Sequence, residues 1–252
     1  LLREKGWTAS ATDDADVVIV NTCGFIRDAK EESIETILSM AAAKEKGKAQ
    51  KLVVTGCLPQ RYGKELLREL PEVDFFVGTG EFHRIADLLD ESEKGKMGQK
   101  QVIGVPEFLY GHRTPRLHTS FPGSTYLKIS EGCANFCSYC VIPRLRGRLR
   151  SRGISSILQE AKQAVSRGVK EINLIGQDIT AYGRDRGDKG GLVTLLKGLV
   201  KVKGLRWIRL LYAHPARVTP DLAHLIRDEE KICRYLDITL QHVNEGILKT
   251  MT

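Results

Sequence analysis

The chain has 252 residues, enough for one large or two ordinary domains, with 42% hydrophobic and 28% charged residues, as in ordinary globular proteins. No apolar run approaches the roughly 18–20 residues that a membrane-spanning helix needs, and the N-terminus lacks an apolar signal segment. We therefore expect a cytoplasmic protein whose six cysteines serve metal binding or catalysis rather than disulfides. The net charge of +8 favours an acidic partner such as nucleic acid, although a merely solvated basic surface explains it equally well.

The N-terminal part alternates short β-branched apolar segments with segments of helical periodicity. The predicted elements are strands at residues 16–20, 51–55 and 73–77 and helices at residues 28–46, 60–70 and 81–89. Alternation at this interval implies right-handed crossovers and a parallel sheet. The sequence therefore predicts an N-terminal α/β domain, residues 1–95.

Two cysteines follow the first two predicted strands of this domain. Cys23 comes after VVIV, and Cys57 comes after LVVT. Because ligands of open α/β sheets bind at the carboxyl ends of the strands, we expect both cysteines at one shared site. Two small buried thiols are the alternative. The first residues read as the last turn of a helix whose strand is absent, and a further strand–Cys unit there would supply a third cysteine.

Residues 96–123 are rich in charge, Gly and Pro, which predicts a linker. A second alternation fills residues 124–252. Its predicted elements are strands at residues 125–130, 171–175, 207–211 and 235–240 and helices at residues 154–167, 192–200 and 220–227. A closed (β/α) barrel needs more units than these. We therefore predict an α/β chain in which a parallel-sheet domain precedes a partial TIM-like barrel, truncated at both ends.

Three cysteines lie close together after the first strand of the second domain. Cys133, Cys137 and Cys140 form C-x3-C-x2-C. Structural zinc sites are closed by four ligands, and His112, His118 and His214 are remote in sequence. Thiolates also hold iron–sulfur clusters, and three of them leave one iron open to a small molecule. The spacing predicts a 4Fe–4S cluster with an open iron, while zinc and a simple electron-transfer cluster remain alternatives.

This motif in the first barrel loop resembles the radical S-adenosylmethionine (SAM) enzymes. The resemblance implies that the SAM amino and carboxylate groups chelate the open iron and that an electron from the cluster cleaves SAM to a 5′-deoxyadenosyl radical. Cys133, Cys137 and Cys140 would be the catalytic cluster ligands. Tyr139, between the second and third cysteines, would lie against the adenine.

The two domains together resemble the methylthiotransferase family, which implies a second, sulfur-carrying 4Fe–4S cluster held by three cysteines. Two of these match Cys23 and Cys57, and the third lies outside this chain. NTCGFIRDAKEESI, RGRLRSR and IGQDITAYG resemble the RimO branch, which adds a methylthio group to the β-carbon of an aspartate of small-ribosomal-subunit protein S-twelve. The resemblance also implies an electron donor such as flavodoxin or ferredoxin. The alternatives are the tRNA-adenosine branch, MiaB, and a non-catalytic iron–sulfur or zinc protein that binds nucleic acid.

Further site residues follow from position. Gly176, Gln177 and Asp178 end the second barrel strand, where the family holds the SAM methionine moiety, and Gln241 ends the fourth in the same way. Thr239 stands where the family leads us to expect proline. Five arginines occur between residues 144 and 152. We expect Arg144 and Arg146, nearest the cluster loop, to contact substrate, and the later arginines to contact ribosomal RNA or to form structural ion pairs.

Overall fold

The structure is a computed structural model. It describes residues 1–10, 15–47, 49–94, 100–116, 122–188 and 190–251. The chain divides into two compact units, which are Leu1–Phe108 with Arg144–Arg146 and Leu109–Pro143 with Gly147–Thr252. The division after Phe108 falls inside the predicted linker; the limits predicted for each domain stay a prediction.

The first unit contains a parallel sheet in the order β1-β2-β3-β4. Its strands are β1 (Val17–Thr22), β2 (Lys51–Gly56), β3 (Phe75–Val77) and β4 (Gln101–Val102). The predicted parallel α/β fold is confirmed. The sequence did not predict β4, which lies within the predicted linker, because two residues are too few to show an alternating pattern.

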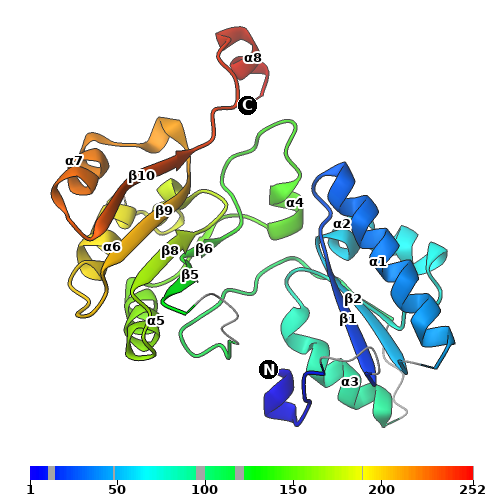
Figure 1. Cartoon of the computed structure of the whole chain (residues 1–252). Coiled ribbons are helices and arrows are strands. Elements are labelled where there is room, and N and C mark those ends of the chain that lie inside the picture. Colours follow the sequence, from blue (N-terminus) through cyan, green and yellow to red (C-terminus); the bar gives the residue numbers. More distant parts are fainter. Residues whose placement is uncertain (11–14, 48, 95–99, 117–121, 189, 252) are drawn as a thin grey trace. The chain divides into compact units, whose positions relative to one another are not determined.

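Helices cover both faces of this sheet (Figure 1). They are α1 (Arg27–Glu45), α2 (Cys57–Glu69) and α3 (Ile85–Glu93), with 3-10 helices η1 (Leu2–Lys5) and η2 (Phe82–Arg84). Successive side chains of a strand point to opposite faces. Accordingly, Leu52 and Val54 of β2 pack in the cluster that contains α1 and α2, whereas Val53 packs in the cluster that contains α3. Burial on both faces explains why β2 is apolar at consecutive positions.

The second unit contains a parallel sheet in the order β10-β9-β8-β5. Its strands are β5 (Ser124–Lys128), β8 (Glu171–Ile175), β9 (Trp207–Ala213) and β10 (Ile232–Ile238). Between β5 and β8 in the chain, β6 (Ser130–Glu131) and β7 (Arg150–Ser151) form a separate, short antiparallel pair. β8 spans the residues predicted for it. β10 begins at Ile232, three residues earlier than the predicted strand at residues 235–240, and therefore contains Cys233.

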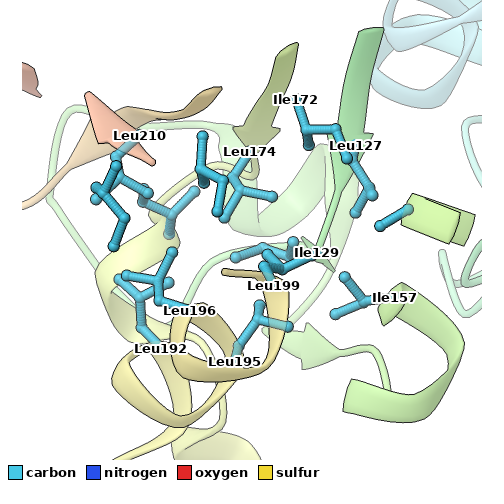
Figure 2. Close-up of a cluster of buried hydrophobic side chains, with 14 of the residues drawn as sticks. Leu127, Ile129, Ile157, Ile172, Leu174, Leu192, Leu195, Leu196, Leu199 and Leu210 are labelled. Carbon is cyan, nitrogen blue, oxygen red and sulfur yellow. The ribbon is translucent and has the colours of Figure 1, made fainter. Parts of the chain in front are cut away.

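Three helices pack against this second sheet and close its core (Figures 1 and 2). They are α5 (Ile154–Ser166), α6 (Gly191–Leu199) and α7 (Pro220–Asp228). Leu127, Leu174 and Leu210, from adjacent strands, meet Leu195 and Leu199 of α6 in one buried cluster. Full burial of a leucine side chain contributes roughly 1.5–3 kcal/mol, so this layer holds the strand ends in place.

The remaining helices of the second half are short. They are α4 (Ile142–Arg146), α8 (Glu245–Thr250) and the 3-10 helices η3 (Ile179–Ala181), η4 (Arg184–Arg186) and η5 (Pro215–Arg217). Over the described residues, none of the helices is both long enough and apolar enough to cross a bilayer.

Candidate functional site

The three-cysteine loop of the second unit begins directly after β6. Gly132 has φ +78, and a Cβ there would lie 2.2 Å from the carbonyl oxygen of Arg148, so only glycine fits. The Cys133 N–H donates to the carbonyl oxygen of Gly147 (3.2 Å), and the Cys140 N–H donates to that of Cys137 (2.9 Å). These bonds fold the loop back on itself. The loop follows β5 and β6, and the active sites of TIM-like barrels lie at the carboxyl ends of the strands.

All three cysteines of the loop are free thiols. Cys133 is buried, and Cys137 and Cys140 are half-buried. Burial raises the pKa of the Cys133 thiol, and the charges of Asp178, Cys140 and Cys137 raise it further, against the lowering effect of the Asn135 backbone N–H. Three soft thiol ligands within eight residues of one loop fit an iron–sulfur cluster, which displaces the thiol protons on binding.

No group of three or more His, Cys, Asp or Glu side chains is arranged around a single ion position in the described ranges. The histidines that were weighed as fourth ligands have other partners. His112 Nδ1 lies 3.2 Å from Ser156 Oγ, and His214 Nδ1 accepts from the Ala216 N–H at the start of η5. His118 lies outside the described residues.

Tyr139 and Gln241, both predicted to contact SAM, come together in the structure. The Tyr139 hydroxyl donates to Gln241 Oε1 over 2.5 Å, although 102 residues separate them. Burial and the neighbouring Cys137 raise the pKa of Tyr139. Tyr139 is 53% exposed, so an aromatic side chain within the cysteine loop is accessible. Thr239, in the same segment as Gln241, is exposed just after β10.

Gly176 and Gln177 lie beside two buried polar residues that the sequence analysis missed. Gly176 approaches Ser130 so closely that a Cβ would lie 2.7 Å from Ser130 Oγ, and Gln177 Nε2 donates to Glu131 Oε1 (3.1 Å). Ser130 Oγ and Gln177 Oε1 are buried and have no hydrogen-bond partner among the residues that the structure describes. Such atoms are uncommon in folded proteins and suit a polar ligand group. The sequence feature that could have identified Ser130 and Glu131 is that this polar pair ends the apolar strand just before Cys133.

Asp178 is 4% exposed, and both its carboxylate oxygens have protein partners. Oδ1 accepts from the Thr180 N–H and hydroxyl and from the Ala181 N–H, which begins η3. Oδ2 accepts from Arg217 Nη1 (2.6 Å) and from Asn135 Nδ2 (3.1 Å). Five donors fill the accepting positions of a carboxylate. The SAM contact expected of Asp178 would have to replace one of them.

The two cysteines of the first unit also lie at neighbouring strand ends. Thr22 pairs with Gly56 in the sheet, so Cys23 and Cys57 follow paired positions. A Cβ on Gly24 would lie 2.7 Å from the carbonyl oxygen of Cys57, which shows how closely the two loops approach. Cys23 is exposed and Cys57 is buried at the first turn of α2. The structure therefore brings together the two residues predicted to share a site.

Residues 144–146 of the arginine run belong to the first unit. Arg146 Nη2 donates to Cys57 Sγ (3.4 Å), and the carbonyl oxygen of the buried Leu145 accepts from Thr79 Oγ1 (2.5 Å). Arg144 is exposed. The substrate contacts predicted for Arg144 and Arg146 stay predictions, but Arg146 has a sulfur contact that the sequence did not indicate.

The end of the arginine run is structural. Arg152 is only 2% exposed; its Nη2 pairs with Glu160 (2.6 Å) and its Nη1 donates to the Lys128 carbonyl oxygen (2.6 Å). Of the two roles predicted for it, the structural ion pair is present. Cys233 is half-buried in β10, and burial raises the pKa of its thiol.

Comparison with known proteins gives two family matches. Residues 1–78 match the model described as "Uncharacterized protein family UPF0004", and residues 127–252, half of the chain, match the radical SAM superfamily.

Curated relatives match along the whole chain. It is 54% identical to "Ribosomal protein uS12 methylthiotransferase RimO" of Geotalea uraniireducens over 251 residues, which is 100% of this chain and 56% of the relative. The proteins of the same name from Pelobacter propionicus and Thermoanaerobacter sp. are 54% and 50% identical, again over 100% of this chain and over 56% and 57% of the relatives. The chain thus spans about half the length of the curated relatives it matches.

Solved structures show the same fold. The radical SAM methyltransferase TsrM from Kitasatospora setae matches with a TM-score of 0.64 at 15% identity, over 92% of this chain and 49% of that one. The cobalamin-dependent SAM radical enzyme OxsB matches with a TM-score of 0.65 at 13% identity, over 94% of this chain and 37% of that one. At these identities the likeness concerns the fold alone.

Proposed function

The chain belongs to the radical SAM superfamily, and on that premise we propose that it is part of a methylthiotransferase acting on an aspartate of ribosomal protein uS12. One observation carries the proposal: three free thiols gather in the loop after β6, in a chain 54% identical to a RimO protein over its whole length. The tRNA-adenosine alternative is not favoured, because the curated relatives named above carry the uS12 name.

Cys133, Cys137 and Cys140 would hold the SAM-cleaving 4Fe–4S cluster. When bound, this cluster supplies an open iron for SAM and the electron that cleaves it. The chain's own residues would bind and orient SAM. Gln177 and Ser130, with unpartnered buried oxygens, suit its amino group, and the exposed ring of Tyr139, fixed by Gln241, suits its adenine.

Cys23 and Cys57 would be two of the ligands of a second, sulfur-carrying 4Fe–4S cluster. Their loops touch through Gly24, and the Cys23 N–H is held by Ser33 Oγ (3.1 Å), so the backbone around the pair is fixed before any metal binds. Arg146 would place a cation beside Cys57 Sγ.

The remaining partners belong to the same proposal. We infer that the protein works in the cytoplasm, receives electrons from a donor such as flavodoxin or ferredoxin, and contacts ribosomal RNA through exposed arginines of residues 144–150. A net charge of +8 supports an anionic surface as one partner. Contacts with phosphates would make binding weaken as salt rises.

Anaerobic reconstitution tests this function against a non-catalytic iron–sulfur or zinc protein. The protein is loaded with iron and sulfide, reduced, and incubated with SAM, and 5′-deoxyadenosine is measured by chromatography. A radical SAM enzyme produces it. A cluster-loaded protein that leaves SAM intact under these conditions would be an electron-transfer or structural protein, and a protein that takes up zinc but no iron would fit the zinc alternative.

A further inference from the structure

Asn135, within the three-cysteine loop, joins that loop to two other loops of the second unit. Its Oδ1 accepts from Arg217 Nη2 (2.5 Å), and its Nδ2 donates to Asp178 Oδ2 (3.1 Å). Arg217 Nη1 donates to the same Asp178 oxygen (2.6 Å), which closes a three-membered network. The three residues come from the cysteine loop, the end of β8 and η5 after β9.

The same asparagine contacts a cysteine sulfur. The Asn135 backbone N–H donates to Cys133 Sγ (3.4 Å). The Asn135 side chain therefore fixes, through Arg217 and Asp178, the backbone group that points at the sulfur. Asp178 in turn accepts hydrogen bonds from the Thr180 and Ala181 N–H groups of η3, so the network is also bonded to this helix.

The network contains a charge pair in which Asp178 is buried and Arg217 is half-buried, and further hydrogen bonds orient both members. Removing one partner of such a pair leaves the other charge uncompensated. The bonding is also geometrically demanding, because the planar guanidinium of Arg217 contacts Asp178 with one amino group and Asn135 with the other. Arg217 is 39 residues from Asp178 and 82 residues from Asn135 in the sequence, and these hydrogen bonds hold the three side chains in one arrangement.

We propose that Asn135, Asp178 and Arg217 are positioning residues that fix the Cys133 sulfur for SAM cleavage; this rests on the proposed function. Partners that orient metal ligands typically change metal affinity or activity about 10- to 100-fold when mutated. An N–H donor to sulfur stabilises the more negative, reduced cluster, so a loosened Asn135 makes its midpoint potential more negative. SAM affinity, which under the proposed function rests on Gln177, Ser130 and Tyr139, changes little.

The test compares Asn135→Ala, Asp178→Asn and Arg217→Lys with the wild type in the reconstituted protein. Asp178→Asn keeps a side-chain oxygen that accepts from the N–H groups of η3. Arg217→Lys keeps the positive charge but loses the planar guanidinium that donates to both Asp178 and Asn135. Arg209→Ala is the matched control, because Arg209 pairs with Glu171 (2.8 Å) between the same two strands, at the start of β8. Iron content, the cluster's midpoint potential, and kcat and KM for SAM cleavage are measured.

We expect each network variant to lose about 10- to 100-fold in kcat or in iron retention, with KM for SAM nearly unchanged and a more negative potential. The double variant Asn135→Ala with Arg217→Lys should be no worse than the more damaging single one, as for residues acting together. Asn135→Ala removes no core packing, so it decides the matter even if the others fold poorly. Wild-type kcat, iron and potential in Asn135→Ala would overturn the proposal. A wild type that cleaves no SAM would instead overturn the proposed function.

Discussion

Arg152 Nη2 lies 2.6 Å from Glu160 Oε2 in the interior of the second unit, where Arg152 is only 2% exposed. The last arginine of a basic run is therefore a core residue, whereas Arg148, four residues earlier, is exposed. Arg152 also donates to the Lys128 carbonyl oxygen and to Ser156 Oγ, which ties β5 to α5. The charge of the arginine run alone does not distinguish a buried ion-pair residue such as Arg152 from an exposed residue such as Arg148.

Arg152→Met should destabilise the protein, because it leaves Glu160 short of its closer partner and the Lys128 carbonyl without a donor. Breaking a buried ion pair from one side costs roughly 3–5 kcal/mol. Urea unfolding of the apo protein measures this as a lower midpoint at an unchanged slope. Arg148→Ala is the control and should stay within about 0.5 kcal/mol of wild type. Equal stability of the two variants would contradict a structural role for Arg152.

Cys133→Ala, Cys137→Ala and Cys140→Ala should each abolish SAM cleavage, because a cluster left with two thiolates is poorly held. The measurement is 5′-deoxyadenosine formation together with iron content. Cys233→Ala is the matched control, since this half-buried thiol lies in β10 outside the loop and should leave both quantities unchanged. Cleavage that persists in all three loop variants would refute the assignment of these ligands.

Cys23→Ala and Cys57→Ala should stop methylthio transfer while 5′-deoxyadenosine formation continues, because the two cysteines belong to the other unit. Iron per protein should fall by up to the content of one cluster. The assay measures both products in the same reaction. If iron does not fall, the two residues are not cluster ligands.

Arg144→Ala and Arg146→Ala should impair turnover of a uS12 peptide that carries the target aspartate. The larger loss is expected for Arg146→Ala, because Arg146 Nη2 donates to Cys57 Sγ while Arg144 is exposed. A lost hydrogen bond from a charged donor costs about 1.5–3 kcal/mol, or roughly 10- to 150-fold in rate. Steady-state kinetics with Arg148→Ala as control checks this. Unchanged turnover in Arg146→Ala would show that the hydrogen bond from Arg146 to Cys57 does not contribute to the reaction.

Tyr182→Phe should change the alkaline stability of the second unit. The buried hydroxyl donates to the Arg152 carbonyl oxygen (2.6 Å), and burial raises the pKa of Tyr182 from 10.0 to about 12. The folded state therefore favours the neutral phenol, and its contribution is fully present below pH 10 and lost as the pH rises to about 12. The variant should lose about 1 kcal/mol at neutral pH and show a flatter decline across that window. The measurement is the urea midpoint of the wild type and of Tyr182→Phe from pH 8 to 12. If the midpoints of the two proteins fall in parallel as the pH rises, the prediction is wrong.

The regular elements could be predicted because their signal is local. β8 was predicted residue for residue, since its apolar residues are bounded by clear turn and linker signals, and α1 was predicted within one residue at each end. β4 and α4, of two and five residues, are too short for periodicity and depend on the elements they join.

The site was predictable only where side chains follow strands directly. Cys133, Cys23 and Cys57 could be placed from strand ends alone. Asn135 and Arg217 could not, because their partners lie 43 and 39 residues away and only the fold brings them to Asp178. The same long-range contacts bond Asp178 to Asn135 and Arg217, which its position in the sequence did not indicate. The cofactor contact predicted for Asp178 stays a prediction.

Mass spectrometry of a uS12 peptide after anaerobic incubation with the reduced, reconstituted protein and SAM tests the central claim most directly. We expect a methylthio group on the β-carbon of the target aspartate, formed together with 5′-deoxyadenosine and absent with Cys133→Ala. An unmodified peptide, in a reaction that cleaves SAM and methylthiolates adenosine in tRNA, would contradict the account.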